Sequence, residues 1–447
     1  MWSSRLLFVL AATGSAVGLG NIWKFPYITG ENGGGAFVLV YLLCIAAIGI
    51  PVMMAEVMIG RAGRQSPINT LRTLVRDSNA NRSWTIIGWM GVAAGFLILS
   101  YYAVIAGWAV SYTFRLGSGV FDGATGAHTS QIFDGFLGSP GSLLFWHTVF
   151  MAATIFIVAR GVARGLEVAV RYLMPILLIL LLGLVGYAAI YGDFARGFEF
   201  LFSFDFSKLS WGGTLTAMGH AFFTLSLGMG AIMAYGAYVP SKASISTTVF
   251  TIGALDTAVA LAAGLAIFPI VFAVAGLEPG DGPGLMFVTL PIAFGNLPLG
   301  AALGCVFFLL VSFAAITSAI SLTEPVLTYL VERYDAKRWI VAVVVGLFCW
   351  LLGIGTVLSF NEWSGATLFG LTFFEVVDYL SYKIMLPLGG LLIALFAGWV
   401  LAKRIVVEQL GFGEGTKWQL WNAAICVIAP AGILIVFAYS LYETFAS

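Results

Sequence analysis

Charged residues are scarce in this chain. Only 9% of its 447 residues are Asp, Glu, Lys or Arg, whereas soluble domains carry about 25%. Hydrophobic residues make up 60%, and 21 basic residues balance 21 acidic ones. The balance gives no sign of a nucleic-acid partner, and a large soluble domain is a remote alternative. The composition predicts an all-α, polytopic membrane protein embedded in a lipid bilayer.

Cysteine and histidine are also rare. The four cysteines lie inside apolar runs without metal-ligand spacing, which predicts packing thiols and no disulfide framework. The three histidines are far apart in the sequence and form no ligand cluster. Because a nucleophile elbow and a phosphate-binding loop are absent as well, an enzyme is disfavoured. These residues are Cys44, Cys305, Cys349, Cys426, His128, His147 and His220.

Apolar runs long enough to cross a bilayer fill the chain, and a span needs about 20 such residues. They predict about eleven transmembrane helices in one transporter-sized domain, residues 1–447. The expected ranges are 5–28, 36–60, 84–115, 143–160, 166–190, 211–238, 246–275, 299–331, 339–358, 375–402 and 418–443. The loop 117–142 is expected to be external, and 278–298 to form an external re-entrant cap.

The basic residues lie mostly in alternate loops. If the N-terminus is cytoplasmic, most Lys and Arg residues fall on the cytoplasmic side, as the positive-inside rule requires. This pattern predicts a multi-pass protein of the cell membrane, with its N-terminus cytoplasmic and its C-terminus outside.

Two apolar segments are interrupted by glycines. Residues 14–21 read Gly-Ser-Ala-Val-Gly-Leu-Gly-Asn, and residues 223–230 read Phe-Thr-Leu-Ser-Leu-Gly-Met-Gly. Open backbone inside a membrane is tolerated only where protein buries it or where it lines a cavity. Matching breaks in two halves are a pointer to a transporter's binding site. We therefore expect a 5+5 inverted repeat, approximately 1–190 and 211–402, with unwound helices 1 and 6 and an extra helix at 418–443.

The chain resembles the neurotransmitter:sodium symporter family, in particular its bacterial amino-acid branch. The most specific segments are 14–26, 31–37, 49–61, 222–230 and 314–325. The resemblance implies the leucine-transporter fold and sodium-driven transport of a small molecule by alternating access.

The resemblance assigns each residue of the family's substrate site to a position in this chain. An opened helix offers amides to a carboxylate and carbonyls to an ammonium group. The resemblance implies that the amides of Leu19 and Gly20 and the Tyr102 hydroxyl hold the carboxylate. Carbonyl oxygens, together with a neutral side-chain pocket, are implied for the rest of the substrate. These further positions are Ala16, Phe223, Thr224, Ser226, Ile98, Met229, Ala319 and Leu322.

The pocket carries no charge, and Met229 adapts readily in shape. We therefore predict a neutral, hydrophobic or aromatic L-amino acid, although Met229 is equally compatible with plain core packing. Relatives that transport monoamines have Asp where this chain has Gly18, so the substrate is expected to bring its own carboxylate.

Two sodium sites are implied, and sodium prefers oxygen ligands. The first would use Ala16, Asn21, Thr224 and Asp256. The second would use Gly14, Val17, Ala314, Thr317 and Ser318, although Thr317 and Ser318 alone would be read as hydroxyls bonded to their own helix. No organic cofactor is expected.

Asp256 is a carboxylate in the middle of an apolar helix, which is a functional candidate by default. Many relatives have Asn at this position. We expect Asp256 to supply the negative charge that chloride supplies in chloride-dependent relatives, so that transport does not need chloride.

The resemblance also implies two gates. Lys24 and Asp378 are expected at the extracellular gate, above a lid of Tyr102 and Phe223. Trp2, Tyr238 and Glu332 match parts of the cytoplasmic gate. His220 beside the outer gate is either a pH-sensitive group or, more readily, a neutral packed side chain.

Glu56 and Glu324 are buried carboxylates that approach the break in helix 6, and we expect them to share a proton. Two alternatives to sodium symport remain, a transport-inactive amino-acid sensor and a proton-coupled carrier on the same fold. The sequence leaves the preferred amino acid and the oligomeric state open.

Overall fold

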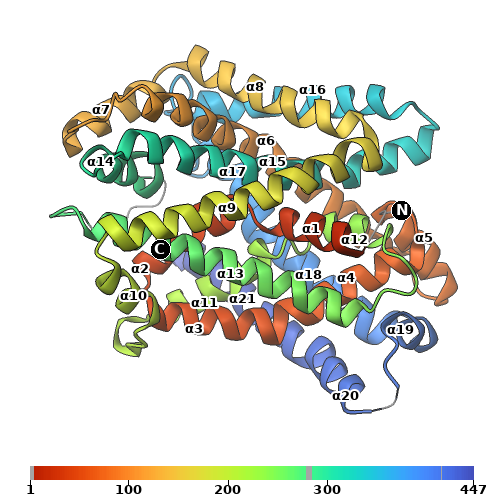
Figure 1. Ribbon diagram of the computed structural model, residues 1–447. Coiled ribbons are helices and arrows are strands. Elements are labelled where there is room, and N and C mark those ends of the chain that lie inside the picture. The colour runs from red at the N-terminus through yellow and green to blue at the C-terminus, as the bar shows by residue number, and fades with distance from the viewer. Residues whose placement is uncertain (1–4, 278–283, 414, 447) are drawn as a thin grey trace.

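A computed structural model describes residues 5–277, 284–413 and 415–446 of the chain. Within these residues, nine helices are long and apolar enough to cross a membrane, and a bent pair near the N-terminus makes a tenth span. The long helices run roughly parallel, with α1 starting at one end of the bundle and α21 ending at the other (Figure 1). The all-α, polytopic fold expected from the composition is confirmed.

The observed spans follow the apolar runs closely. Several are divided by short widened turns, so that one span carries more than one helix label. The single-helix spans are α6 (Ile86–Gly117), α8 (Pro140–Ala159), α9 (Glu167–Tyr191), α13 (Ile245–Phe272), α15 (Gly300–Tyr334) and α16 (Arg338–Ser359). The divided spans are α3 and α4 (Gly35–Cys44, Ile50–Gly63), α17 and α18 (Phe373–Asp378, Leu386–Leu395), and α20 and α21 (Thr416–Ala423, Ala429–Ala446).

The first span breaks where the glycines predicted it. Helix α1 covers Arg5–Ala16, and the chain resumes a helical path at Gly20 before α2, Phe25–Glu31. The two parts are bent by 50°. Glycine weakens a helix because it loses more backbone freedom on folding than other residues, and the side chain of Asn21 accepts the free Gly18 amide at 3.1 Å. The break is therefore a specific local structure.

The predicted sixth helix is present as two helices, α11 (Trp211–Thr224) and α12 (Ala231–Gly236), which are too short to be counted among the ten candidate spans. The pair is called the sixth span here, after its place in the predicted order. Between them, Ser226, Gly228 and Gly230 have φ angles of 55°, 79° and 73°. This left-handed backbone interrupts a right-handed helix. A Cβ on Gly228 would lie 2.6 Å from the carbonyl oxygen of Leu386, so both the conformation and the close approach require glycine here.

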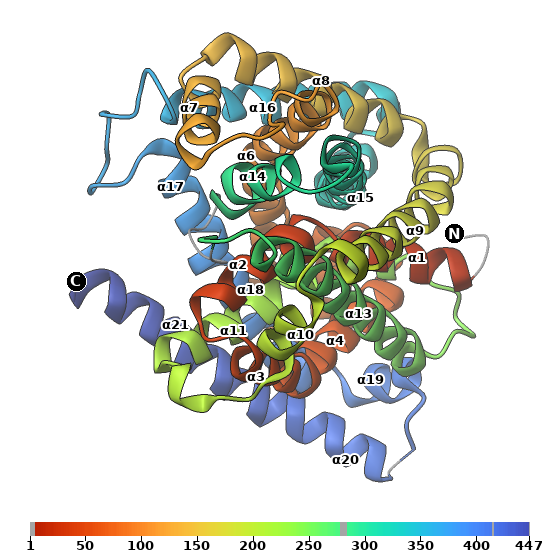
Figure 2. The same ribbon diagram turned by 60° about the vertical axis from the view of Figure 1, so that its left-hand side comes forward.

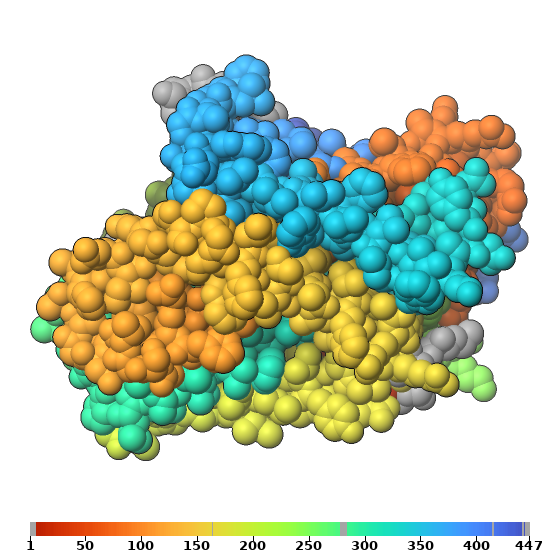
Figure 3. All heavy atoms as spheres, turned by 90° about the horizontal axis from the view of Figure 1, so that it is seen from above, coloured from red at the N-terminus to blue at the C-terminus, as the bar shows by residue number. Residues whose placement is uncertain are grey.

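The spans pack in two groups. Helices α6, α8, α15 and α16 contact one another, and the broken spans with α4 and α13 form a second group. Helix α1 also packs against α15 and α9, which joins the groups. The face of the bundle that carries α8, α9 and α16 is broad and continuous (Figure 3). The bounds of the two repeats, 1–190 and 211–402, stay a prediction.

Hydropathy did not reveal the short helices between spans. Residues 117–142 contain α7 (Gly126–Leu137), and the loops carry α5 (Pro67–Asp77), α10 (Phe194–Phe202) and α19 (Lys403–Leu410). The expected re-entrant cap at 278–298 contains α14 (Leu290–Gly295), which packs against α13 and α15. Residues 278–283 of that cap lie outside the described part of the chain.

Candidate functional site

A small cavity lies between the two helix breaks. Its enclosed volume is about 20 Å³. The sequence predicted most of the residues that line it, including Tyr102 and Phe223 on opposite helices. The predicted residues on the wall are Ala16, Leu19, Gly20, Ile98, Tyr102, Phe223, Ser226, Met229 and Leu322, and the others are Ser15, Gly18, Ser318 and Ser321. Thr224 and Ala319 are buried but are not on this wall.

Two of the groups predicted to bind a carboxylate are hydrogen-bonded to each other at the wall of the cavity. The Leu19 amide donates to the Tyr102 hydroxyl oxygen at 3.3 Å. A Cβ added to Gly18 would come within 2.4 Å of Ser318 Oγ and 2.9 Å of the Tyr102 oxygen. Only glycine lets the backbone approach these polar atoms so closely. A carboxylate here would meet the Tyr102 hydroxyl and the Leu19 amide in exchange for the hydrogen bond that these two groups make to each other.

The opposite wall carries carbonyl oxygens and hydroxyls. Ser226 Oγ donates to the Ser15 carbonyl at 2.9 Å, which ties the two breaks together. Ser226 and Thr224 are buried, as is Ser15. The Ser15 carbonyl oxygen also accepts a hydrogen bond from Ser318 Oγ at 3.1 Å, so this buried oxygen has hydroxyl partners from two spans.

Three of the four predicted ligands of the first sodium site, Asn21, Thr224 and Asp256, come together, whereas Ala16 lies on the cavity wall. Asn21 Nδ2 donates to Asp256 Oδ1 at 2.7 Å, and Thr224 Oγ1 lies 3.2 and 3.0 Å from the two carboxylate oxygens. Asp256 is fully buried in α13. Three oxygen-bearing side chains from three spans thus share one place, with one formal negative charge, which fits the chemistry of a small hard cation.

The predicted second site lies between α1 and α15. Ser318 Oγ contacts the carbonyl oxygens of Gly14 and Val17 at 3.5 and 3.4 Å. Thr317 Oγ1 donates to the Ala314 carbonyl at 2.9 Å, a bond within its own helix. Ser318 therefore joins α15 to the carbonyl oxygens of Gly14 and Val17, whereas the Thr317 hydroxyl is bonded within α15. The donor chemistry of the predicted set fits sodium as well, since every one of its atoms is a neutral oxygen.

The outer side of the cavity is closed by aromatic rings and a lysine. The Phe223 ring packs edge-on to the Tyr382 ring, with 5.2 Å between centroids. Lys24 Nζ lies 3.3 Å from the Tyr382 centroid and 4.8 Å from that of Phe223. Lys24 and Asp378 both line a larger cavity of about 330 Å³ beyond this lid. Within the described residues no ion pair joins Lys24 to Asp378, and the ammonium group lies over the Tyr382 ring, as in a gate looser than one closed by a bidentate arginine.

His220 is completely buried in α11. Its ring is surrounded by those of Phe25, Tyr41 and Phe223, at 6.1, 5.5 and 6.4 Å between centroids. Within the described part of the chain, neither of its ring nitrogens has a hydrogen-bond partner. This apolar setting favours the neutral, packed histidine over the pH-sensitive one.

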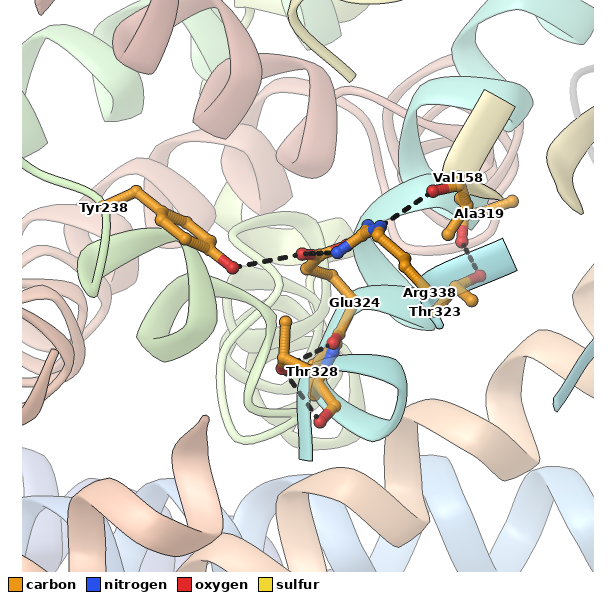
Figure 4. A network of polar contacts seen from close by, with 8 residues as sticks. Val158, Tyr238, Ala319, Thr323, Glu324, Thr328 and Arg338 are labelled. Atoms are coloured by element: carbon orange, nitrogen blue, oxygen red, sulfur yellow. Dashed lines mark hydrogen bonds and ion pairs between the residues drawn. The ribbon is translucent and has the colours of Figure 1, made fainter. Parts of the chain in front are cut away.

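The two buried glutamates have separate partners. Glu56 Oε1 accepts the Gly228 amide at 2.7 Å and so supports the break in the sixth span. Glu324 is paired with Arg338, whose nitrogens donate at 3.0 and 2.5 Å to its two oxygens (Figure 4). The prediction that Glu56 and Glu324 share a proton is therefore wrong for this structure, because a guanidinium group neutralises Glu324.

Arg338 is a residue that the sequence analysis missed. It also donates through Nε to the Val158 carbonyl at 3.0 Å, and the Tyr238 hydroxyl lies 3.4 Å from Glu324 Oε1. Figure 4 shows the arginine reaching Glu324 from one side and Tyr238 from the other. This network connects the end of α8, the start of α16 and the segment after α12. The sequence shows that Arg338 is a basic residue at the start of an apolar run, but it does not show that the side chain reaches Glu324.

The predicted cytoplasmic gate also includes Glu332 and Trp2. Glu332 accepts the Ser66 amide at 2.8 Å and Asn69 Nδ2 at 2.9 Å, so it caps α5 and is not a solvated loop charge. Trp2 lies outside the described residues.

Comparison with known proteins identifies the family of this chain. The model of the sodium:neurotransmitter symporter family matches residues 1–119 and 131–446. The chain belongs to this family. It is therefore a sodium-dependent transporter, as the resemblance implied.

Individual relatives agree along the whole chain. The sodium-dependent transporter YhdH of Bacillus subtilis is 37% identical over 98% of this chain and 96% of its own length. A sodium-dependent transporter of Haemophilus influenzae is 35% identical over 99% of this chain and 98% of its own. The crystal structure of MhsT in complex with L-phenylalanine matches with a TM-score of 0.90 and 45% identity, covering 98% of this chain and 99% of that one.

Proposed function

We propose that this family member imports a neutral, hydrophobic or aromatic L-amino acid together with sodium. The observation that carries the proposal is the cavity between the two breaks. Leu19 and Tyr102 offer a carboxylate site on one side, while Ile98, Met229 and Leu322 leave an uncharged space for a side chain. The relative MhsT, crystallised with L-phenylalanine, supports this substrate class.

Sodium and substrate would be coupled because their proposed sites are next to each other. Ala16 lines the cavity, and Asn21, a few residues further along the same break, is bonded to Asp256. A substrate carboxylate in the cavity can complete the oxygen shell of a sodium ion beside Asn21 and Thr224. Each ligand then raises the affinity for the other, because coupling between two binding sites is reciprocal.

Alternating access would open one side of this cavity at a time. The outer lid is formed by Phe223, Tyr382 and Lys24. The opposite closure is the Glu324–Arg338 network together with Tyr238. In our proposal the network faces the cytoplasm, as the distribution of basic residues suggests. The membrane potential would add about 2.3 kcal/mol per 100 mV for each charge moved inward.

We also propose that transport does not need chloride. Asp256 already places a negative charge beside the proposed first sodium site. An additional anion there would be repelled in the low dielectric of the membrane interior.

Uptake of the twenty amino acids into proteoliposomes, with and without an inward sodium gradient, tests the function. We expect concentrative uptake of hydrophobic and aromatic amino acids only with the gradient. Uptake driven by a proton gradient alone would favour a proton-coupled carrier. Sodium-dependent binding without any uptake would favour a sensor. The variants Asn21→Ala and Thr317→Ala should lose the sodium-dependent component.

A further inference from the structure

The connection between α16 and α17 contains a tight turn with an apolar tip. Leu368 and Leu371 exchange two backbone hydrogen bonds, at 2.8 and 3.0 Å, around Phe369 and Gly370. These two central residues have φ angles of 54° and 80°. Both positive values identify a type I′ turn, in which Asn, Asp or Gly is normally found. A bulky phenylalanine in this conformation is an outlier, so the turn alone does not explain its presence.

The tip exposes its apolar side chains. At the turn, Phe369 is 95% exposed and Leu368 57%, and nearer the base of the connection Trp363 is 45% exposed. Among residues 360–372 the one charged side chain is Glu362. A cluster of exposed apolar side chains on a loop marks an interaction surface.

The base of this connection is held firmly. The Trp363 amide donates to the Leu358 carbonyl at 2.8 Å, and Asn361 Nδ2 donates to the Leu137 carbonyl at 2.9 Å. The Phe374 amide donates to Ser359 Oγ at 3.0 Å. The two ends of the connection are therefore tied to α16, α7 and α17.

The position of the loop matches a membrane boundary. Helix α16 has 22 residues, and at 1.5 Å per residue it spans about 33 Å, close to the roughly 30 Å of a bilayer's hydrocarbon core. The loop therefore begins where the headgroup region begins. Figure 2 shows the light-blue connection from α16 to α17 projecting sideways, away from the bundle. A sideways projection at this depth points into lipid.

We propose that Phe369, with Leu368 and Trp363, inserts into the headgroup boundary of the surrounding bilayer and anchors the α16–α17 connection there. Trp, Phe and Leu are the side chains that interfacial segments bury at the boundary between headgroups and acyl chains. A second copy of the chain fits the tip less well. A stable protein interface buries about 800 Å² on each partner, which a single projecting turn with three large side chains does not offer. In the proposed orientation this is the outer leaflet, but the inference itself does not depend on the transport function.

Site-directed spin labelling tests the insertion. Phe369→Cys would be labelled with a nitroxide in a variant lacking the four native cysteines and reconstituted in nanodiscs. Collision rates would then be measured with oxygen, which concentrates in lipid, and with a water-soluble nickel chelate. Leu347→Cys, on the exposed face of α16, serves as the lipid reference, and Asp122→Cys, in the connection before α7, as the water reference.

The proposal predicts that oxygen collisions at position 369 exceed nickel collisions, as at position 347. Dominant nickel collisions, as at position 122, would overturn it. Protection from both reagents would also overturn it, since protein would then cover the tip.

Hydroxyl-radical footprinting of the unaltered protein in nanodiscs provides a second measurement if the cysteine-free variant does not fold. We expect Phe369 to be oxidised about fivefold more slowly than in its isolated peptide, because the interface shields it from water. The exposed His128 on α7 serves as the internal reference. Equal rates for Phe369 in the nanodisc and in the peptide would contradict the proposal.

Discussion

Lys24 places its ammonium group over the ring of Tyr382, 3.3 Å from the centroid. The same ring contacts Phe223, which forms part of the cavity wall. A cation over an aromatic face is attracted by the electron-rich ring, by about 1 kcal/mol or more when partly desolvated. The contact joins the first and tenth spans beside the cavity, where the sequence analysis placed a gate containing Lys24 and Asp378.

Removing the ring of Tyr382 should loosen this lid. We expect Tyr382→Leu to release bound amino acid about fivefold faster, corresponding to the loss of about 1 kcal/mol. Tyr382→Phe keeps the ring and should behave like the unaltered protein. Dissociation of radiolabelled substrate in sodium-containing buffer measures both. Equal effects of the two substitutions would show that the hydroxyl, and not the ring, holds the lid.

The negative charge of Asp256 should determine both the affinity for sodium and the independence from chloride. We expect Asp256→Asn to lower the apparent affinity for sodium by about tenfold or more, because ligand charge sets affinity at oxygen sites for hard cations. Replacing chloride by gluconate should leave uptake by the unaltered protein unchanged. Thr224→Ser, which keeps a hydroxyl beside Asp256, is the matched control. Loss of uptake in gluconate would contradict the role of Asp256 as the compensating anion.

The Glu324–Arg338 pair offers a test of the closure on the proposed cytoplasmic side. The Glu324 side chain is fully buried and that of Arg338 is 21% exposed. Removing one partner of a buried pair costs about 3–5 kcal/mol, since the other charge is left uncompensated. We expect Arg338→Gln to destabilise the closed state by somewhat less, given its partial exposure.

The double variant Glu324→Gln/Arg338→Gln should recover much of that loss. Accessibility of a cysteine introduced at Ser321, on the cavity wall, to a membrane-impermeant thiol reagent added from the α16 N-terminal side measures opening. If the single and double variants open equally, the pair does not contribute to closure.

Met229 is expected to set the size of the substrate. Its side chain lines a cavity of only about 20 Å³, so that the pocket must widen around a large side chain. Met229→Ala should therefore raise the affinity for tryptophan relative to leucine. Competition binding with a labelled amino acid measures the ratio. An unchanged ratio would assign Met229 to core packing, the other reading of this residue.

The helix breaks could be predicted because their signal is local. Glycine, serine and asparagine in an apolar run weaken a helix wherever they occur, and Gly18 and Gly228 lie where the backbone opens. The convergence of Asn21, Thr224 and Asp256 depended on the family resemblance, since these residues are far apart in the sequence. Without the resemblance, only Asp256 would have been identified as a functional candidate, because it is a carboxylate inside an apolar helix.

Contacts made by long, flexible side chains could not be predicted in this way. The ammonium group of Lys24 reaches Tyr382, and the guanidinium group of Arg338 reaches Glu324, through several rotatable bonds. Which partner each group finds depends on the packing of neighbouring spans. The short helices α5 and α7 were missed for a related reason, because they lie between spans and lack their length.

The most direct test of sodium-coupled transport measures two fluxes in the same proteoliposomes, with radioactive sodium and a labelled hydrophobic amino acid. The account predicts that external amino acid stimulates sodium entry and that Thr317→Ala abolishes both coupled fluxes. Amino-acid uptake that proceeds without sodium entry would contradict it.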